Sequence, residues 1–409
     1  MFKFIAFCFA IFLIDYYGYQ FIKTTFDNRW TKITYVLSSV IILGLTFYTY
    51  TFGRQNLSIP TSNIFTGIFV LVYVTKLTFA LVFFIDDIFR IFKAVFNFFT
   101  NNSDEKSFHI PSRRKFTKQL ALGLAAIPFS SLLYGIIKGK YNFKVLNYTL
   151  YFEDLPEAFD GYQLTQISDI HSGSFDNKEK IEYAIDLINQ QKSDAILFTG
   201  DMVNLSADEM LPWKSTFKKL QAKDGIFSVL GNHDYGDYVK WNSPQEKVQN
   251  LENLKQIQKE MGFQLLLNEN RFIERNDQRI AMVGVENWGN GFIQKGDLNK
   301  ASENIAASDF KILLSHDPTH WQEKVISDSN HYHLTLSGHT HGMQMGIEIP
   351  GFIKWSPIKW RYKYWAGIYK EKGQYLNVNR GFGFLAYPGR VGVWPEITVI
   401  NLKKGSKPS

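Results

Sequence analysis

Aspartate and histidine recur at short spacing in five places in the second half of the chain. The stretches are "SDIHSG", "GDMVN", "GNHD", "LSHDP" and "GHTHG", and they contain five of the nine histidines. Imidazole nitrogens suit zinc, iron and manganese, and carboxylate oxygens can bridge two ions. The polar side chains gathered in these stretches include Asp169, His171, Asp201, Asn232, His233, Asp234, His316, His339 and His341. That number of donors suits two metal ions roughly 3.5–4 Å apart, a site that activates water and stabilises a phosphoryl group.

The elements around these stretches must bring them together. Each stretch closes a short apolar run typical of a buried strand. These runs are residues 162–171, 194–201, 225–234, 310–318 and 332–341, with a sixth at 279–287. Segments with helical spacing lie between them at 178–191, 207–221 and 244–261. Alternating strands and helices predict an α/β domain, and ligands in such domains bind beyond the carboxyl ends of the strands.

Two of the stretches place donors two residues apart. On an extended strand, such residues point to the same side. The pairs Asp169 with His171 and His339 with His341 are therefore each expected to present two donors to one site. Asp201 follows Gly200 directly, and the backbone freedom of that glycine would let the carboxylate lie between two ions.

The five stretches, in this order and at these spacings, resemble the calcineurin-like metallophosphoesterase family. The lead-in "LPEAFDGYQLTQISDIH" and the tail "NVNRGFGFLAYPGRVGVWPEI" resemble its membrane-associated bacterial branch, in which the catalytic domain follows a transmembrane or twin-arginine segment. The resemblance covers about residues 145 to 402. It implies an α/β four-layer sandwich, in which two mixed sheets are flanked by helices.

The resemblance also implies a role for each residue. One divalent ion would be held by Asp169, His171 and His341, and the other by Asn232, His316 and His339, with Asp201 bridging them. Manganese, zinc and iron all remain open. His233 matches a histidine that is not a ligand and that would stabilise or protonate the leaving oxygen.

Three further positions lie close in sequence to these predicted site residues. Many relatives have Asp at position 204 to orient the catalytic histidine; Asn204 can accept a hydrogen bond from an imidazole but brings no charge. Asp234 is expected either to bond to an imidazole or to serve a turn. Met343 stands where relatives often have Gly, which would alter the lip of the site.

Apolar runs before residue 140 predict a separate transmembrane region. A helix needs roughly 20 apolar residues to cross a bilayer. We predict a transmembrane region over residues 1–140, with helices at 2–22, 33–52, 64–85 and 117–137, and a catalytic domain over 141–409. Three basic residues lie in the first loop, one in the second, and a larger group before the fourth helix. Because positive loops stay in the cytoplasm, the catalytic domain is expected on the outer, periplasmic side of a bacterial inner membrane.

The stretch "SRRKFTK", Ser112–Lys118, allows two interpretations. It is similar to a twin-arginine export signal, and it also serves as a basic stop beside a span. Both place the following domain outside. The single cysteine, Cys8, excludes a disulfide within the chain and thiolate metal sites.

The segment Gly351–Gly367 interleaves three tryptophans, Trp355, Trp360 and Trp365, with basic residues. Aromatic rings and cations together are typical of a membrane interface. The segment is expected either to touch lipid and guide an anionic, lipid-linked substrate, or to pack its tryptophans over the domain edge.

The expected function is hydrolysis of phosphomonoesters or phosphodiesters, on lipid or cell-envelope substrates, by a membrane-anchored enzyme with two metal ions. Membrane lipids are the expected partners. The sequence shows no clustered nucleic-acid-binding patch and no sign of an obligate protein partner. The alternative is a membrane sensor or transporter subunit whose outer domain binds metal without catalysis. Asp15 and Lys76, inside the predicted spans, would serve that function.

Overall fold

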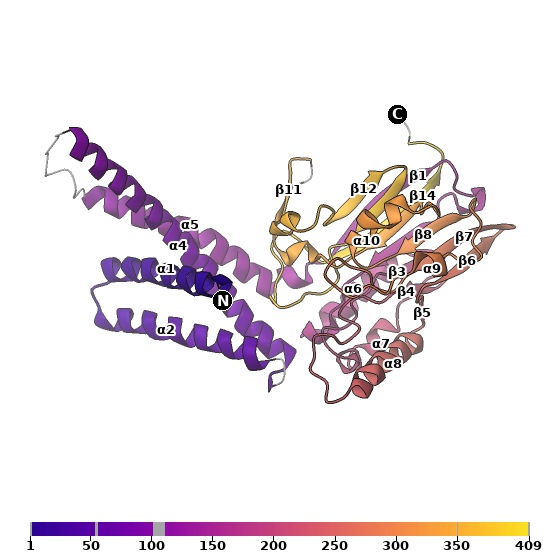
Figure 1. Ribbon diagram of the computed structural model, residues 1–409, viewed down its shortest axis with the longest axis horizontal. Helices are drawn as coiled ribbons and strands as arrows, with labels where there is room; N and C mark the ends of the chain where they lie inside the picture. The colour runs from indigo at the N-terminus through magenta and orange to yellow at the C-terminus, as the bar shows by residue number, and fades with distance from the viewer. Residues whose placement is uncertain (1, 54–55, 101–110, 350, 408–409) are drawn as a thin grey trace. The chain divides into compact units, whose positions relative to one another are not determined.

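A computed structural model describes residues 2–53, 56–100, 111–349 and 351–407 (Figure 1). The backbone forms two compact units, Met1–Ile136 and Ile137–Ser409. We refer to them as the membrane unit and the catalytic unit. The division falls close to the predicted one at residues 140 and 141.

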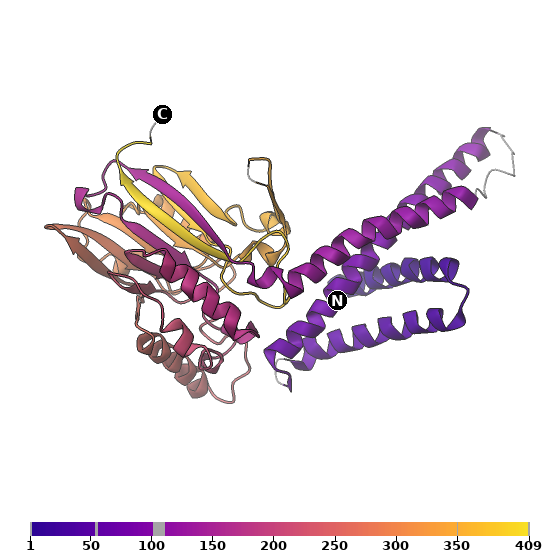
Figure 2. The ribbon, with the colours of Figure 1, turned by 180° about the vertical axis from the view of Figure 1, so that it is seen from behind.

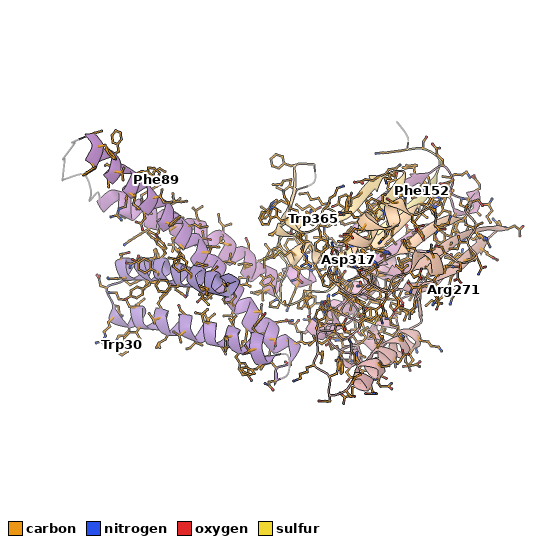
Figure 3. All side chains as sticks on the ribbon, viewed as in Figure 1. Trp30, Phe89, Phe152, Arg271, Asp317 and Trp365 are labelled. Carbon is orange, nitrogen blue, oxygen red and sulfur yellow. The ribbon has the colours of Figure 1, made fainter. Side chains whose placement is uncertain are left out.

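The membrane unit consists of long apolar helices. They are α1 (Phe2–Thr25), α2 (Arg29–Tyr48), α4 (Ile59–Thr100) and α5 (Pro111–Ile137), and a short π-helical turn, Thr49–Gly53, extends α2. Within the described residues, four helices are long and apolar enough to cross a membrane. Many large apolar side chains point outward, including Trp30 and Phe89 (Figure 3). An apolar exterior is what helices surrounded by lipid require.

Helix α4 is much longer than the predicted span of residues 64–85, because it continues to Thr100. The prediction stopped where Asp86, Asp87 and Arg90 end the apolar run. Charged side chains do not interrupt the hydrogen bonds of the helix backbone, so the helix extends past the apolar stretch. At 1.5 Å per residue, the helix exceeds the roughly 30 Å thickness of a hydrocarbon core.

A polar cluster joins three helices of the membrane unit. Nζ of Lys76 on α4 lies 2.7 Å from Oδ1 of Asp15 on α1 and 2.7 Å from Oγ of Ser39 on α2. The hydroxyl of Tyr73 donates to the other Asp15 oxygen at 2.8 Å. The ammonium group also lies over the rings of Tyr35 and Tyr73. Asp15 and Lys76 therefore form an ion pair between helices.

The catalytic unit contains short helices and many strands. Its helices are α6 (Lys178–Gln190), α7 (Lys214–Phe217), α8 (Pro244–Glu260), α9 (Leu298–Ala301) and α10 (Pro318–Glu323). Its first seven strands after the linker are β1 (Lys144–Phe152), β2 (Gln163–Ile167), β3 (Ala195–Phe198), β4 (Ile226–Ser228), β5 (Phe263–Leu265), β6 (Glu269–Arg275) and β7 (Gln278–Gly284). The others are β8 (Phe310–Leu314), β9 (Leu334–Ser337), β10 (Ile347–Ile349), β11 (Ile353–Trp355), β12 (Gly367–Glu371), β13 (Gln374–Val378) and β14 (Glu396–Lys404).

The strands form two six-stranded mixed sheets and one small hairpin. The first sheet has the order β1-β14-β2-β3-β4-β5, in which only β14 and β2 pair antiparallel. The second has the order β12-β13-β9-β8-β7-β6, with antiparallel pairs at both edges. Strands β10 and β11 form a separate antiparallel hairpin. The predicted fold class, an α/β domain with mixed sheets behind an all-α membrane region, is confirmed.

The buried apolar side chains lie between the two sheets and between each sheet and its helices. Leu164 and Leu197 of the first sheet pack with Met282 and Leu336 of the second in the core between the sheets. Helix α6 carries Ile181, Ala184, Ile185 and Ile188 on one face, and they pack on the outer side of the first sheet (Figure 2). Helices α9 and α10 cover the second sheet. This apolar spacing explains why the helix predicted at 178–191 is found as α6. The helix predicted at 207–221 was wrong, because that segment forms only a 3-10 turn, Ala207–Met210, and the four-residue helix α7.

The strands end earlier than predicted. Strand β2 ends at Ile167 rather than at residue 171, and β9 ends at Ser337 rather than at 341. Strand β3 ends at Phe198. The candidate ligands therefore lie on loops just beyond the strands.

Candidate metal centre

Three buried donor groups meet beyond the ends of β2 and β9. Nε2 of His171 lies 3.0 Å from Nε2 of His341, which in turn lies 3.2 Å from Oδ1 of Asp169. One ligand atom from each residue lies within 4.8 Å of the other two. We call Asp169, His171 and His341 the first group. Their spacing allows them to hold one cation.

A second group lies beyond the ends of β3, β8 and β9. Ligand atoms of Asp201, His316 and His339 lie within 4.8 Å of one another. Asn232 adds a fourth donor, because its Oδ1 atom lies 2.8 Å from Nδ1 of His339. We call these four residues the second group. His339 and His341, although two residues apart, belong to different groups.

Asp201 connects the two groups. Its Oδ2 atom lies 3.1 Å from Nε2 of His316 and 3.6 Å from Nε2 of His171. Its Oδ1 atom accepts a hydrogen bond from the backbone N–H of His233 at 2.8 Å. The structure thus brings all seven predicted ligands together, with one carboxylate between the two groups.

The backbone at these ligands is not extended. The φ angles are positive at Asp169 (52°), His171 (47°), Asp201 (60°), His339 (71°) and His341 (49°). The argument from strand alternation was therefore wrong for these residues, because the chain leaves each strand before it reaches them. Asp and His tolerate the left-handed region better than most residues, and such conformations cluster at functional sites.

Two glycines leave room for the carboxylates. A Cβ atom at Gly231 would lie 2.2 Å from Oδ1 of Asp201, and one at Gly338 would lie 2.2 Å from Oδ2 of Asp169. Both distances are far shorter than any real contact. A side chain at either position would push a carboxylate out of its group.

The chemistry of the donor set fits divalent cations. A neutral imidazole carries only one N–H, yet the Nε2 atoms of His171 and His341 face each other. Among the described residues, the buried Nε2 of His316 has no hydrogen-bond partner. Buried polar atoms usually have one. Cations between these nitrogens and carboxylates would satisfy both groups.

The charges around the second group also favour a bound cation. Burial lowers the pKa of His316, but the nearby negative charges of Asp201 and Asp169 raise it further, to about 10. Burial lowers the pKa of His171 and His339 below the ordinary value. Burial raises the pKa of Asp201, and the surrounding histidines lower it well below its usual range. The carboxylate therefore stays charged and attracts positive charge, which a metal ion can supply.

His233 is oriented by the backbone of Asn204. Its Nδ1 atom lies 2.7 Å from the main-chain oxygen of that residue. The Asn204 side chain donates to Oγ of Ser174 at 2.8 Å. The hydrogen bond that the Asn204 side chain could accept from an imidazole is thus provided by the backbone carbonyl of the same residue. With Nδ1 bonded to a carbonyl, Nε2 of His233 is the ring atom left for a substrate.

Glu209 holds the turn that provides this carbonyl. Its carboxylate accepts hydrogen bonds from the N–H groups of Asn204 at 2.6 Å, Leu205 at 2.9 Å and Ser206 at 3.0 Å. Burial raises the pKa of Glu209 to about 7, although these N–H groups lower it. The Ser-x-x-Glu spacing of a capping box, Ser206 to Glu209, is the sequence signal that could have identified it.

Asp234 supports the backbone rather than an imidazole. Its Oδ2 atom accepts from the N–H groups of Asp201 at 3.0 Å and Gly231 at 2.9 Å, and its Oδ1 atom accepts from Met202 at 2.8 Å. Of the two predicted roles, the turn role is the one that the structure shows. Burial and the charge of Asp201 raise the pKa of Asp234 to about 7.

Three residues of the site were missed. The hydroxyl of Tyr362 lies 2.8 Å from Nε2 of His339, and Oδ2 of the buried Asp317 lies 3.4 Å from the same atom. Nη2 of the buried Arg390 lies 3.2 Å from Nδ1 of His341. Asp317 follows His316 in the sequence and could have been found there. Tyr362 and Arg390 lie in loops that are distant in sequence from the five stretches, and no sequence pattern identified them as site residues.

Met343 lies in the turn His341–Gln344 with a φ of 54° and an exposed side chain. Glycine adopts this backbone without strain, which explains the residue of the relatives. Two histidines outside the five stretches, His320 and His333, have ordinary packing roles. His320 bonds to Ser315 and stacks on Trp288, and His333 pairs with Asp154.

Comparisons with known proteins place both units in families. Residues 2–140 match the family model described as "Probable Calcineurin-like phosphoesterase, transmembrane domain", and residues 162–343 match "Calcineurin-like phosphoesterase". The uncharacterized metallophosphoesterase YkuE of Bacillus subtilis is 28% identical over 302 residues, which cover 71% of this chain and 98% of that protein.

Two further relatives share the arrangement to different extents. An uncharacterized metallophosphoesterase of Helicobacter pylori is 25% identical over 405 residues and 97% of each chain. A transmembrane protein with a metallophosphoesterase domain from Danio rerio is 25% identical over 285 residues, 66% of this chain and 60% of that protein. This chain is therefore a membrane protein of the calcineurin-like metallophosphoesterase family, a family of metal-dependent phosphoesterases, with a four-helix transmembrane domain ahead of its phosphoesterase domain.

Proposed function

We propose that the protein hydrolyses phosphomonoester or phosphodiester bonds with two divalent metal ions held side by side. The observation that supports this most directly is the position of Asp201. Its Oδ2 atom lies 3.1 Å from Nε2 of His316 and 3.6 Å from Nε2 of His171, so a single carboxylate oxygen belongs to both groups of donors. A shared carboxylate is what a pair of ions roughly 3.5–4 Å apart requires.

In this proposal each group holds one ion, and Asp201 is a ligand to both. Imidazole, amide and carboxylate donors suit manganese, zinc and iron alike. Two such ions, when bound, polarise the phosphoryl oxygens and neutralise the charge that develops during hydrolysis. Asp234 and the glycine at position 231 keep the Asp201 carboxylate at its place between the groups.

His233 acts on the leaving oxygen. Its Nδ1 atom bonds to the carbonyl of Asn204, so the proton available for transfer is the one on Nε2. The ring packs edge-on against His171 at a centroid distance of 4.9 Å, which places it beside the first group. A protonated His233 can therefore give its Nε2 proton to the departing alkoxide.

We further propose a multi-pass location in a bacterial inner membrane, with the catalytic unit on the periplasmic side. Support comes from the excess of basic residues in the first loop and before the fourth helix. On that side the available substrates are phosphoesters of lipids and of the cell envelope.

The test uses the full-length protein in detergent, stripped of metal and then supplied with manganese. We expect hydrolysis of 4-nitrophenyl phosphate or bis(4-nitrophenyl) phosphate only after manganese is added, and its loss in Asp201→Asn. Hydrolysis that is equally fast after metal removal, or in Asp201→Asn, would overturn the proposal.

A further inference from the structure

The β10–β11 hairpin is fastened to the catalytic unit by its polar face. The register pairs Glu348 with Lys354. Arg380 donates two hydrogen bonds to Glu348, at 3.0 Å from Nε and 2.6 Å from Nη2. The Lys354 ammonium donates to the carbonyl of Ala366 and lies 5.2 Å from the centroid of the Trp365 ring. The charged residues of the hairpin thus face the rest of the unit.

The opposite face of the hairpin is apolar and exposed. Ile349 pairs with Ile353, and Ile347 pairs with Trp355, so these residues share the face that Glu348 does not. Ile347 and Ile349 are about half exposed, and Phe352 at the turn is 86% exposed. In a sheet with one solvated face, the apolar face normally packs on the core. This hairpin has the reverse arrangement and stands out from the sheets (Figure 1).

Neighbouring side chains enlarge the exposed face. Trp360 is 76% exposed, and its ring meets that of Trp355 at a centroid distance of 5.9 Å. The apolar patch consists of Ile347, Ile349, Phe352, Ile353 and Trp360. Trp365 does not belong to it, because it is buried with Tyr362 and Ala366. The three tryptophans of the segment therefore differ in their surroundings.

Basic side chains accompany the patch. Lys359 and Arg361 flank Trp360 and are exposed. Lys363 pairs with Glu371 at 3.0 Å, and Lys354 donates to the carbonyl of Ala366. Exposed apolar side chains beside exposed cations are typical of segments that enter the headgroup region of an anionic bilayer.

The hairpin is continuous with the metal centre at both ends. It begins directly after the turn His341–Gln344, whose first residue is in the first group. It returns to Tyr362, whose hydroxyl contacts His339 of the second group at 2.8 Å. The chain segments on both sides of the hairpin therefore contribute to or contact the donor groups.

The connection between the last candidate span and the catalytic unit is short. Helix α5 ends at Ile137 and β1 begins at Lys144, so only six residues separate a candidate span from the first strand. Six extended residues reach at most about 20 Å. The Gly139 backbone already packs against Arg390 and Trp394 of the catalytic unit, which shortens the free linker.

We infer that the apolar patch inserts into the bilayer that holds the membrane unit, and that the substrate is a phosphoester on a membrane lipid, which reaches the metal centre along the hairpin. The lipid-substrate part rests on the proposed function, whereas insertion does not. A bilayer is favoured over a protein partner because cations border the patch and a membrane span lies six residues from the domain.

Insertion is tested with a fluorophore on a single cysteine. Cys8 is the only cysteine, so Cys8→Ser with Phe352→Cys accepts one environment-sensitive label. The matched control is Val248→Cys on α8, another exposed apolar residue. The full chain is reconstituted into phosphatidylcholine–phosphatidylglycerol vesicles with doxyl-labelled lipid. We expect quenching at position 352 to exceed that at 248 by about threefold or more. Equal quenching at the two positions, including the case where another protein copy covers the patch, would overturn insertion.

The substrate class is tested by a ratio of rates. Ile349→Glu with Phe352→Glu is compared with Val248→Glu on a diacyl phospholipid ester in the same vesicles and on bis(4-nitrophenyl) phosphate. We expect the ratio of lipid to aryl hydrolysis to fall about tenfold or more in the hairpin variant alone. An unchanged ratio would overturn the lipid route. Absence of any hydrolysis by the unmodified protein would contradict the proposed function, while the quenching result would still stand.

Discussion

The membrane unit and the catalytic unit each bury a cluster of polar and charged side chains, and the clusters differ in how well their atoms satisfy one another. In the membrane unit, Lys76 has Asp15 and Ser39 at 2.7 Å, and Tyr73 donates to the remaining oxygen of Asp15. Positive charge meets negative charge and donors meet acceptors. A cluster closed in this way holds helices together and needs no ligand.

The cluster of the catalytic unit contains polar atoms that its own residues do not satisfy. The ring nitrogens of His171 and His341 face each other at 3.0 Å, and two carboxylates lie among the imidazoles. Within the described residues, a buried nitrogen of His316 has no hydrogen-bond partner. Divalent cations would satisfy the facing nitrogens and the carboxylates together. We therefore assign a structural role to the cluster of the membrane unit and a catalytic role to that of the catalytic unit. The following substitutions test this difference.

The largest effect is expected from Asp201→Asn. The substitution keeps the shape of the side chain and removes the charge that both groups share. We expect hydrolysis of bis(4-nitrophenyl) phosphate to fall by about 10³-fold or more, as for the loss of a group that stabilises the transition-state charge. The exposed Asp208→Asn is the control. A loss equal in both variants would show that the effect is not specific to the metal centre.

His233→Ala removes the group assigned to the leaving oxygen but leaves every proposed ligand. We expect kcat to fall by about 10²–10⁴-fold, the range of general acid catalysis, while bound metal stays unchanged. Metal analysis and steady-state kinetics on one sample check both parts. The control is the exposed His331→Ala. Loss of metal from His233→Ala would contradict the separation of its role from binding.

Lys76→Met breaks the closed cluster and leaves Asp15 without its counter-charge. Breaking a buried ion pair costs about 3–5 kcal/mol, so we expect a lower melting temperature of the protein in detergent. Hydrolysis at a temperature where the variant remains folded should match the wild type. Lys93→Met, on the exposed end of α4, is the control. A folded Lys76→Met variant without phosphoesterase activity would favour a coupled sensor or transporter.

The smallest effect is expected from Glu209→Gln. The amide cannot accept all three backbone hydrogen bonds, so the carbonyl of Asn204 shifts and kcat falls by about tenfold or less. Burial raises the folded-state pKa of Glu209 from 4.5 to about 7, so its contribution to stability is complete below pH 4.5 and is lost as pH rises toward 7.

Melting temperatures of the two proteins between pH 4.5 and 8 measure this contribution. The melting temperature of the wild type should fall relative to that of Glu209→Gln as pH rises through this range. A constant difference would show that Glu209 does not titrate there.

The sequence predicted the ligand types and the layered fold because both depend on local patterns. Apolar runs and helical spacing predicted the strands and α6, and the five stretches contain all seven candidate ligands. The positive φ angles at Asp169 and His341 were not predictable from the sequence. Glycine at these positions would have indicated a left-handed backbone, but Asp and His do not. The role of the Asn204 backbone was hidden because a carbonyl is common to all residues.

Long-range contacts were the other failure. Tyr362 reaches His339 from a loop whose aromatic residues looked equivalent, and Trp365 in the same loop is buried while Trp360 is exposed. Only the register of the β10–β11 hairpin distinguishes its two faces. Composition shows that such a segment is amphipathic, but folding decides which side faces outward.

The metal content of the purified full-length protein tests the central claim most directly. After reconstitution with manganese and removal of the free ion, mass spectrometry should find two ions per chain in the wild type. Asp201→Asn should hold one ion or none. A single ion in the wild type, or two ions retained by Asp201→Asn, would contradict a centre in which one carboxylate connects two groups of donors.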